Sequence, residues 1–235
     1  MQLFYTTNNG PELAIFEGEE CLHLSKSLRK KSGESIDWTD GMGNLYTGEI
    51  ITIERHQIRV KIQNIEERSR GRDYNLTLLV APTKQADRIE WMLEKAIEIG
   101  LDVFVPIICG HSEQIRMKTD RLERIAISAM KQSQQFHLPV IRALTPFQSY
   151  LDHPIEGQGF IAHCAKKGMP KLPSLIKPVG NITVCIGPEG DFSSIEISTA
   201  LNAGYQEISL GNTRLRTETA GLIACAQIQA KSLET

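Results

Sequence analysis

The sequence of 235 residues has no long apolar run and no leader-like beginning. No stretch reaches the roughly 18 consecutive apolar residues that a membrane-spanning helix needs. The first residues, Met1 to Thr6, lack the order of basic and then apolar residues that marks a secretory signal peptide. We therefore expect a cytoplasmic protein without a membrane partner.

Patterns for disulfide and metal chemistry are also missing. The five cysteines are scattered and include no C-x-x-C pair, and the six histidines show no H-E-x-x-H spacing. An odd number of cysteines in apolar surroundings is typical of reduced, buried thiols. We expect no disulfide framework and no bound metal.

The common nucleotide-binding motifs are absent as well. No G-x-G-x-x-G follows an expected strand, and no G-x-S-x-G occurs anywhere. The segment most similar to a phosphate-binding loop, residues 43–49, carries Glu49 where such a loop needs a lysine. These absences argue against a dinucleotide-binding fold and against a P-loop nucleotidase.

What is present is an ordinary globular composition, with 41% hydrophobic and 23% charged residues and a net charge of −2. The overall charge gives no sign of a nucleic-acid partner, but the cations are grouped. Lysine and arginine fill four of the positions 26–31 and recur six times between residues 55 and 72. Such strips either follow phosphates or form a solvated face. The candidate phosphate contacts are Arg29, Lys30, Arg70 and Arg72.

Residues 1–72 read as a small, strand-rich domain. Residues 36–41 and 45–51 alternate in polarity around turn residues and predict a hairpin. Residues 55–65 alternate again, and one helix is expected over 19–30. Short strands separated by polar turns favour a small barrel.

A polar segment, residues 66–73, is the best linker candidate. After it, the sequence pattern predicts alternating strands and helices. Capping-box spacing at Asp87 and at Ser193 marks two helix starts. This alternation predicts a mostly parallel sheet with helices on both faces for residues 73–235. The expected strands are 76–80, 103–105, 159–162, 182–186 and 208–210, and further helices begin near Asp120 and Thr217.

Two glycine-containing turns follow expected strands of this sheet: Gly187–Gly190 and Gly211–Thr217. Ligands of parallel sheets bind beyond the carboxyl ends of the strands, so these turns are candidates for the two walls of one site. The first turn is also compatible with a plain strand-to-helix connection. In the second, Thr217 suits a helix cap and Glu218 a helix start, but Arg214 and Arg216 would be unfavourable there without an anionic partner.

At these turns the sequence resembles the SPOUT methyltransferases, and specifically the RsmE family of 16S ribosomal RNA uridine-N3 methyltransferases. The resemblance covers nearly the whole chain. It rests on Ile186–Gly190, on Leu210-Gly211 and on Leu215–Ala220, with support from Lys95–Gly100 and Leu28-Arg29. One position and one segment depart from the family pattern. Asp191 replaces a second glycine, and residues 131–135 stand where the family has E-Q-S-x-R, a segment expected near the substrate.

The resemblance implies a fold and a cofactor that periodicity alone does not give. The implied fold is a SPOUT-type parallel sheet with a C-terminal trefoil knot, an exception to the rule that chains are unknotted, preceded by a PUA-like barrel. The implied partners are S-adenosylmethionine, a second copy of the chain in a homodimer, and 16S rRNA of the small ribosomal subunit. The implied cofactor-binding residues are Ala162, His163, Gly187, Pro188, Glu189, Gly190, Leu210, Gly211, Leu215 and Arg216.

Methylation of a uracil nitrogen needs an oriented base and a group that helps to remove the N3 proton, but no nucleophilic cysteine. The hypothesis is that Arg216 stabilises the uracil anion, while Glu218 or Glu189 accepts the proton or positions a water. For Glu218, a role at the helix start is an equally good interpretation. Two alternatives stay open: methylation of another RNA atom such as a ribose 2′-oxygen, and a non-catalytic protein of RNA binding or ribosome assembly.

Overall fold

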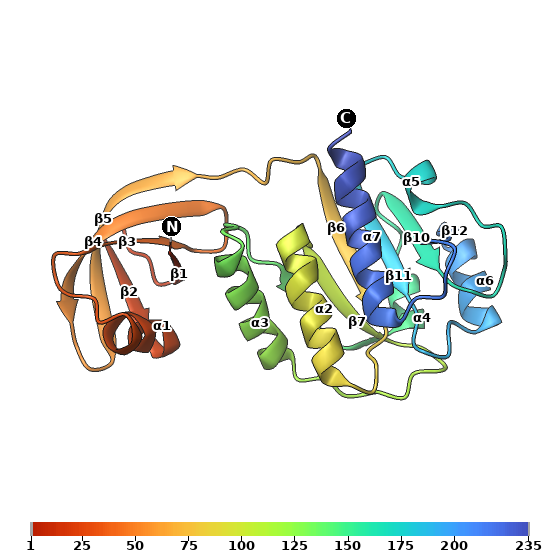
Figure 1. The fold of residues 1–235 in the computed structure, drawn as a ribbon, viewed down its shortest axis with the longest axis horizontal. Helices are drawn as coiled ribbons and strands as arrows, with labels where there is room; N and C mark the ends of the chain where they lie inside the picture. Colours follow the sequence, from red (N-terminus) through yellow and green to blue (C-terminus); the bar gives the residue numbers. More distant parts are fainter. Residues whose placement is uncertain (1, 235) are drawn as a thin grey trace. The chain divides into compact units, whose positions relative to one another are not determined.

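Two β-sheets with separate hydrophobic cores organise the chain (Figure 1). The structure is a computed structural model and describes residues 2–234. The first unit contains the residues up to Gly71 together with Ile127–Leu138, and the second contains Arg72–Ala126 and the residues from Pro139 onwards. None of the described helices combines the length and the apolarity needed to cross a membrane.

The sheet of the first unit has the strand order β1-β3-β4-β5-β2. Its strands are β1 (Leu3–Tyr5), β2 (Leu13–Glu17), β3 (Ser35–Thr39), β4 (Asn44–Ile53) and β5 (Gln57–Glu67). The antiparallel pairing of β3 with β4 confirms the predicted hairpin. The edges of the sheet approach each other, because the Thr6 hydroxyl donates to the carbonyl of Ile15 (2.7 Å) and the Ile15 amide donates to Asn8 (2.9 Å). The sheet is therefore curled into a partial barrel.

Aromatic side chains fill the inside of this curled sheet. The Trp38 ring is stacked on Tyr46 at 5.3 Å and meets Phe16 edge-on at 5.6 Å. Ile58 and Val60 are fully buried, as their alternation predicts. The expected helix over 19–30 is shorter and irregular: α1 (Gly18–Leu22) passes into a π-helical turn, η1 (His23–Ser27).

Asp40 organises the turn between β3 and β4. Its carboxylate accepts hydrogen bonds from the amide of Met42 (2.8 Å), the side chain of Asn44 (2.7 Å) and the hydroxyl of Tyr46 (3.1 Å). Burial acts to raise the pKa of Asp40, but these hydrogen bonds outweigh it and lower the pKa below its ordinary value. The same turn holds residues 136–138, since Gly43 donates to the carbonyl of Phe136 (2.8 Å) and Leu138 donates to Gly41 (2.8 Å).

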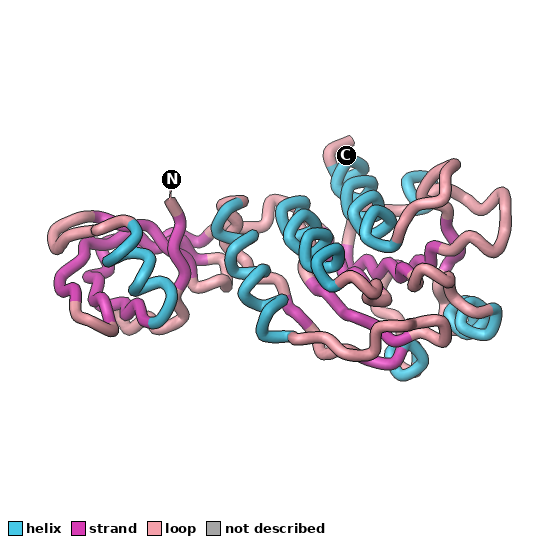
Figure 2. The backbone as a smooth tube through the Cα atoms, turned by 60° about the horizontal axis from the view of Figure 1, so that its bottom comes forward, coloured by secondary structure: helices cyan, strands magenta, loops and turns pink. Residues whose placement is uncertain are grey.

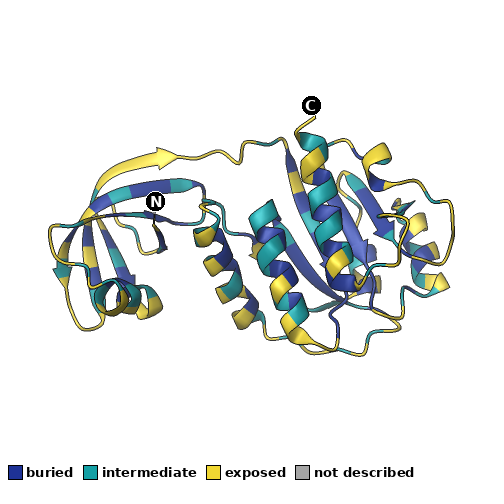
Figure 3. Cartoon of the chain, in the orientation of Figure 1, coloured by how far each residue is buried: buried dark blue, intermediate teal, exposed yellow. Residues whose placement is uncertain are grey.

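The sheet of the second unit is parallel throughout, with the order β12-β10-β11-β6-β7-β8 and β9 paired to β7. This confirms the predicted fold class. Its strands are β6 (Tyr74–Val80), β7 (Val103–Ile108), β8 (Val140–Ile141), β9 (Thr145–Pro146), β10 (Gln158–Ala162), β11 (Gly180–Ile186) and β12 (Gln206–Ile208). The last strand lies two residues earlier than expected. Central strands β6 and β11 are buried along most of their length (Figure 3).

Helices cover both faces of this sheet. They are α2 (Ala86–Ile99), α4 (Phe147–Leu151), α5 (Leu172–Leu175), α6 (Ser194–Asn202) and α7 (Thr217–Ser232), while α3 (Thr119–Gln132) runs from the second unit into the first. Figures 1 and 2 show α2 and α7 side by side on one face. Phe147 and Leu151 of α4 pack with Ile197 and Ala200 of α6 in the core on the other face.

The two predicted capping boxes have different outcomes. Ser193 caps α6 as expected, since its hydroxyl accepts from the Glu196 amide (3.3 Å) and the Glu196 carboxylate accepts from the Ser193 amide (2.8 Å). The prediction at Asp87 is wrong, because α2 begins at Ala86 and its N-cap, Gln85, makes no side-chain cap. Asp87 instead lies in the first turn, where a negative charge favours the helix dipole.

Candidate functional site

A cavity opens at the carboxyl ends of β10, β11 and β12. Its volume is about 1140 Å³, and three segments form most of its wall: residues 162–169, residues 186–189 with Asp191, and residues 208–217. Ligand sites in proteins commonly measure about 300–1,000 Å³, so a cofactor of nucleoside size fits. Pro188 and Leu215 both line this one cavity, as expected for two walls of a common site.

The structure brings the expected cofactor residues together, with one exception. Gly190 is not among the lining residues; a Cβ there would lie 3.0 Å from the Cβ of His111, so this glycine permits a close approach to the loop after β7. The residues that line the cavity are Ala162, His163, Gly187, Pro188, Glu189, Leu210, Gly211, Leu215 and Arg216.

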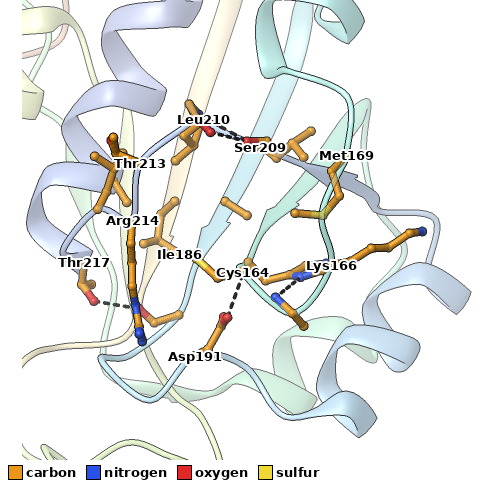
Figure 4. Close-up of a pocket in the computed structure, with 18 of the residues that line it drawn as sticks. Cys164, Lys166, Met169, Ile186, Asp191, Ser209, Leu210, Thr213, Arg214 and Thr217 are labelled. Carbon is orange, nitrogen blue, oxygen red and sulfur yellow. Dashed lines mark hydrogen bonds between the residues drawn. The ribbon is translucent and has the colours of Figure 1, made fainter.

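The turn after β11 is closed by local contacts. The Asp191 amide donates to the carbonyl of Pro188 (2.9 Å), and a Cβ at Gly187 would come within 3.0 Å of the Phe192 ring. The prediction that Thr217 caps α7 is wrong: Arg216 is the N-cap, and Thr217 is the first helical residue. Its hydroxyl donates to the carbonyl of Gly187 (3.0 Å), which ties the start of α7 to the turn (Figure 4).

The loop before α7 presents two arginines to the cavity. Arg214 reaches the backbone of the opposite wall, with its guanidinium 3.5 Å from the carbonyl oxygen of Glu189 (Figure 4). Arg216 is exposed, and within residues 2–234 its guanidinium has no hydrogen bond or ion pair. An unpaired cation at a helix N-terminus favours an anion or a developing negative charge in front of it.

The two candidate carboxylates differ in their surroundings. Glu189 is exposed and lines the cavity. Glu218 is not a lining residue; its side chain is 10% exposed and pairs with Arg88 of α2 at 3.3 Å. Glu218 therefore connects α7 to α2, in line with its structural interpretation.

His163 is fixed by hydrogen bonds through both ring nitrogens. Its Nδ1 accepts from the amide of Ala165 (3.3 Å), so Nε2 carries the proton and donates to Glu207 (3.1 Å). Glu207 also pairs with Lys166 (3.1 Å), and the hydrogen bond from Lys166, with a smaller contribution from His163, lowers the pKa of Glu207. His163 thus shapes the wall after β10.

Cys164 and Asp191 were not predicted as site residues, but both line the cavity. The expectation of buried thiols holds for four cysteines and is wrong for Cys164, which is exposed. Asp191 has a left-handed backbone with φ of 65° and accepts a hydrogen bond from the Cys164 amide (2.7 Å). A positive φ explains why glycine is usual at this position, which was the only signal in the sequence.

Three of the candidate phosphate contacts belong to the first unit. Arg29 is exposed and has φ of 53°, at the position after η1 where glycine is usual. Arg70 is also exposed, whereas Lys30 is half-buried and pairs with Glu34 at 2.9 Å. Arg29 and Arg70 are thus the more accessible to a polyanion.

Arg72 has a different environment, in the second unit. Its guanidinium donates to the Asp102 carboxylate (2.8 Å) and lies over the Tyr74 ring, 4.6 Å from the centroid. The other oxygen of Asp102 accepts from the amide of Leu76 (2.7 Å). These contacts join the start of β6 to the segment before β7, so Arg72 is part of the fold.

In the part of the chain that the structure describes, no cluster of three or more His, Cys, Asp or Glu side chains forms a metal site. A cofactor-sized cavity with glycine turns at parallel strand ends defines the second unit as an α/β domain that binds a nucleoside-type ligand. The chain belongs to the RNA methyltransferases: the model of the RNA methyltransferase domain matches residues 71–229, and that of the RNA methyltransferase PUA domain matches residues 16–63.

Its relatives place it in the RsmE family within that class, as the motifs predicted. The chain is 27% identical over 228 residues to the ribosomal RNA small subunit methyltransferase E of Rickettsia conorii, a match that covers 94% of this chain and 90% of the relative. The solved structure of a probable rRNA-methyltransferase from Porphyromonas gingivalis is similar over 99% of both chains, with 39% identity and a TM-score of 0.93.

The ribosomal RNA small subunit methyltransferase E from Neisseria gonorrhoeae, bound to S-adenosyl methionine, is 29% identical and has a TM-score of 0.85. That similarity covers 98% of this chain and 97% of the other. The expected parallel sheet and PUA-like first unit are confirmed by these likenesses. The trefoil knot stays a prediction.

Proposed function

We propose that this protein uses S-adenosylmethionine to methylate N3 of a uridine in 16S rRNA of the small ribosomal subunit. The observation that carries the proposal is the single cavity walled by the Gly187 turn and the Leu210–Arg216 loop. Support comes from the relatives named small subunit methyltransferases and from the Neisseria gonorrhoeae relative with its bound cofactor.

The residues present fit this cofactor. The cavity is large enough, and Gly211 lines it at a point where an added Cβ would meet no atom within 4 Å and would project into open space. Gly211→Val is therefore expected to fill part of the cavity and weaken S-adenosylmethionine binding without changing the unfolding midpoint. Calorimetry of this variant and the wild type would refute the fit if the two affinities were equal.

The bound donor supplies an electrophilic methyl group, and the chain must orient the base and manage its N3 proton. Arg216 is the cation at the cavity wall that stabilises the uracil anion as the proton leaves. Glu189 is the better candidate for accepting that proton, since it is exposed at the wall whereas Glu218 is held by Arg88.

Single-turnover methyl transfer with saturating donor tests this assignment. By analogy with the loss of one preorganised donor, Arg216→Ala is expected to slow the step by about 10²–10³-fold. A wild-type rate for this variant would refute the role of Arg216. Glu218→Gln should leave the rate nearly unchanged and Glu189→Gln should lower it; the reverse order would show that the two carboxylates are wrongly assigned.

Mapping of the modified nucleotide by mass spectrometry tests the reaction itself. A methyl group on uridine N3 supports the proposal, and one on a ribose 2′-oxygen replaces it with the alternative chemistry. Absence of both cofactor binding and methyl transfer would favour a non-catalytic RNA-binding protein. Free 16S rRNA and assembled small subunits serve as parallel substrates.

We further propose that residues 1–72 form the RNA-binding domain and residues 73–235 the methyltransferase domain of a cytoplasmic homodimer. Arg29, Lys30 and Arg70 are the proposed cations that touch phosphate. Replacing any one of them by alanine should reduce the slope of log affinity against log salt by about 0.7–0.9. Light scattering of the purified chain tests the dimer, and a monomeric mass at working concentration would refute it.

A further inference from the structure

Asp191 has an unusual conformation for its position in the cofactor cavity. It is one of three non-glycine residues with positive φ among those described, at 65°. The left-handed conformation is unfavourable for an ordinary residue and, glycine aside, least so for Asn and Asp. A side chain kept where glycine would be easier is expected to contribute through its own contacts.

The contacts of Asp191 connect two walls of the cavity. One carboxylate oxygen accepts from the Cys164 amide (2.7 Å), in the wall after β10 (Figure 4). The other accepts from the Phe192 amide (2.8 Å), in the turn after β11. Hydrogen bonds to an ionised carboxylate are about twice as strong as those between neutral groups. The carboxylate is thus a bridge between segments 27 residues apart in sequence.

The wall that the bridge holds has little other support. Residues 164–168 are all exposed, so burial of apolar side chains does not fix them. Exposed segments with few buried contacts open most readily. Besides the bridge, the hydrogen bonds found for these described residues are that of the Ala165 amide with His163 and that of Lys166 with Glu207, where the lysine is exposed.

We propose that Asp191 is a positioning residue that holds segment 164–168 against the turn after β11, and so preorganises the cavity for the cofactor. The inference rests on the proposed function in that S-adenosylmethionine is taken as the ligand. The carboxylate acts through the Cys164 amide, so its effect is on the shape of the cavity. Ligands that share the adenosyl and amino-acid parts, with or without the transferable methyl group, should therefore be affected alike.

The test compares Asp191→Gly with Asp191→Asn. Glycine keeps the backbone conformation and removes both acceptors, whereas asparagine tolerates positive φ and keeps one acceptor oxygen. Loss of a hydrogen bond to a charged group, worth about 1.5–3 kcal/mol, corresponds to a roughly 10- to 150-fold loss of affinity. We expect the loss for S-adenosylmethionine to be of this size with glycine and smaller with asparagine.

Two readouts separate positioning from a merely structural role. The unfolding midpoint of Asp191→Gly should change little, because relief of the left-handed strain offsets part of the lost hydrogen bonding. Without any ligand, hydrogen–deuterium exchange of the Cys164 amide should be at least several-fold faster in the glycine variant than in the wild type. Equal exchange rates in both proteins would overturn the inference.

The choice of ligand distinguishes the remaining possibilities. S-adenosylhomocysteine lacks the sulfonium charge, so equal losses for both ligands support positioning. A loss confined to S-adenosylmethionine would show a direct charge contact and overturn the proposal. If the wild type binds neither ligand, the proposed function fails, while the exchange experiment still decides whether Asp191 holds the wall.

Discussion

Arg72 offers a sharp test, because the sequence made it a candidate phosphate contact and the structure makes it a buried ion-pair partner. Its side chain is 15% exposed and that of Asp102 only 5%. Arg72→Met keeps most of the aliphatic stem but removes the guanidinium that pairs with the Asp102 carboxylate. The hydrogen bond from the Leu76 amide to that carboxylate stays in place. Breaking a buried ion pair in this way costs about 3–5 kcal/mol.

The contact with the Tyr74 ring adds to this loss. A cation over an aromatic ring contributes about 0.5–2 kcal/mol, depending on how well it is shielded from water. The total of about 3.5–7 kcal/mol is a large part of the roughly 5–15 kcal/mol by which domains are stable. We therefore expect Arg72→Met to lower the unfolding midpoint strongly.

Urea unfolding followed by circular dichroism measures the effect, with the double variant Arg72→Met/Asp102→Leu as control. The double variant removes both charges and mainly leaves the Leu76 amide unpaired. An unpaired buried amide lowers the free energy of unfolding by about 1–3 kcal/mol. It should be more stable than Arg72→Met alone. A free energy of unfolding within about 0.5 kcal/mol of the wild-type value is the range of neutral surface changes. Such a result for Arg72→Met would refute this reasoning, and Arg72 would again be a candidate phosphate contact.

Three further predictions concern other parts of the chain. Because the folded state lowers the pKa of Asp40, its contribution to stability is present above the ordinary value of 3.8 and lost as the pH falls below it; Asp40→Asn should flatten the acid limb of a pH–stability curve. Gly48→Ala would place a Cβ within 2.3 Å of the Lys61 carbonyl, and at least ~1–3 kcal/mol of destabilisation should appear in urea unfolding. S-adenosylmethionine should slow alkylation of the exposed Cys164, measured by mass spectrometry; an unchanged rate would contradict its place at the cofactor wall.

The alkylation experiment is selective because the other thiols are protected. Burial raises the pKa of every other cysteine, so their thiolate fractions at neutral pH are small. These residues are Cys21, Cys109, Cys185 and Cys225, all of them buried. A labelled peptide other than that of Cys164 would indicate local opening.

Regular elements were predictable where periodicity is strong. The apolar run at residues 76–80, the alternation at 55–65 and the capping box at Ser193 each reflect local preferences that the fold preserves. Predictions that depended on single residues at the ends of elements were the least reliable. Thr217 and Asp87 both have cap-forming side chains, but each lies inside its helix, since the N-caps are Arg216 and Gln85.

The short elements β8, β9, α4 and α5 gave no signal, since two to five residues do not complete a recognisable period. The return of residues 127–138 to the first unit was equally hidden. Backbone hydrogen bonds of Phe136 and Leu138 with the turn after β3 hold this segment, together with the Lys131–Glu20 ion pair. These partners are far apart in sequence, so no local pattern records them.

The sequence by itself determined the fold class, the two glycine turns and the family, because these depend on residue types at short spacings. Only the tertiary structure decided which polar residues are available for chemistry. It left Arg216 and Glu189 at the cavity, placed Glu218 against Arg88 and Arg72 against Asp102, and made Asp191 a bridge. The physical reason is that an ion pair or hydrogen bond depends on partners 25 to 130 residues away, and no local pattern records them.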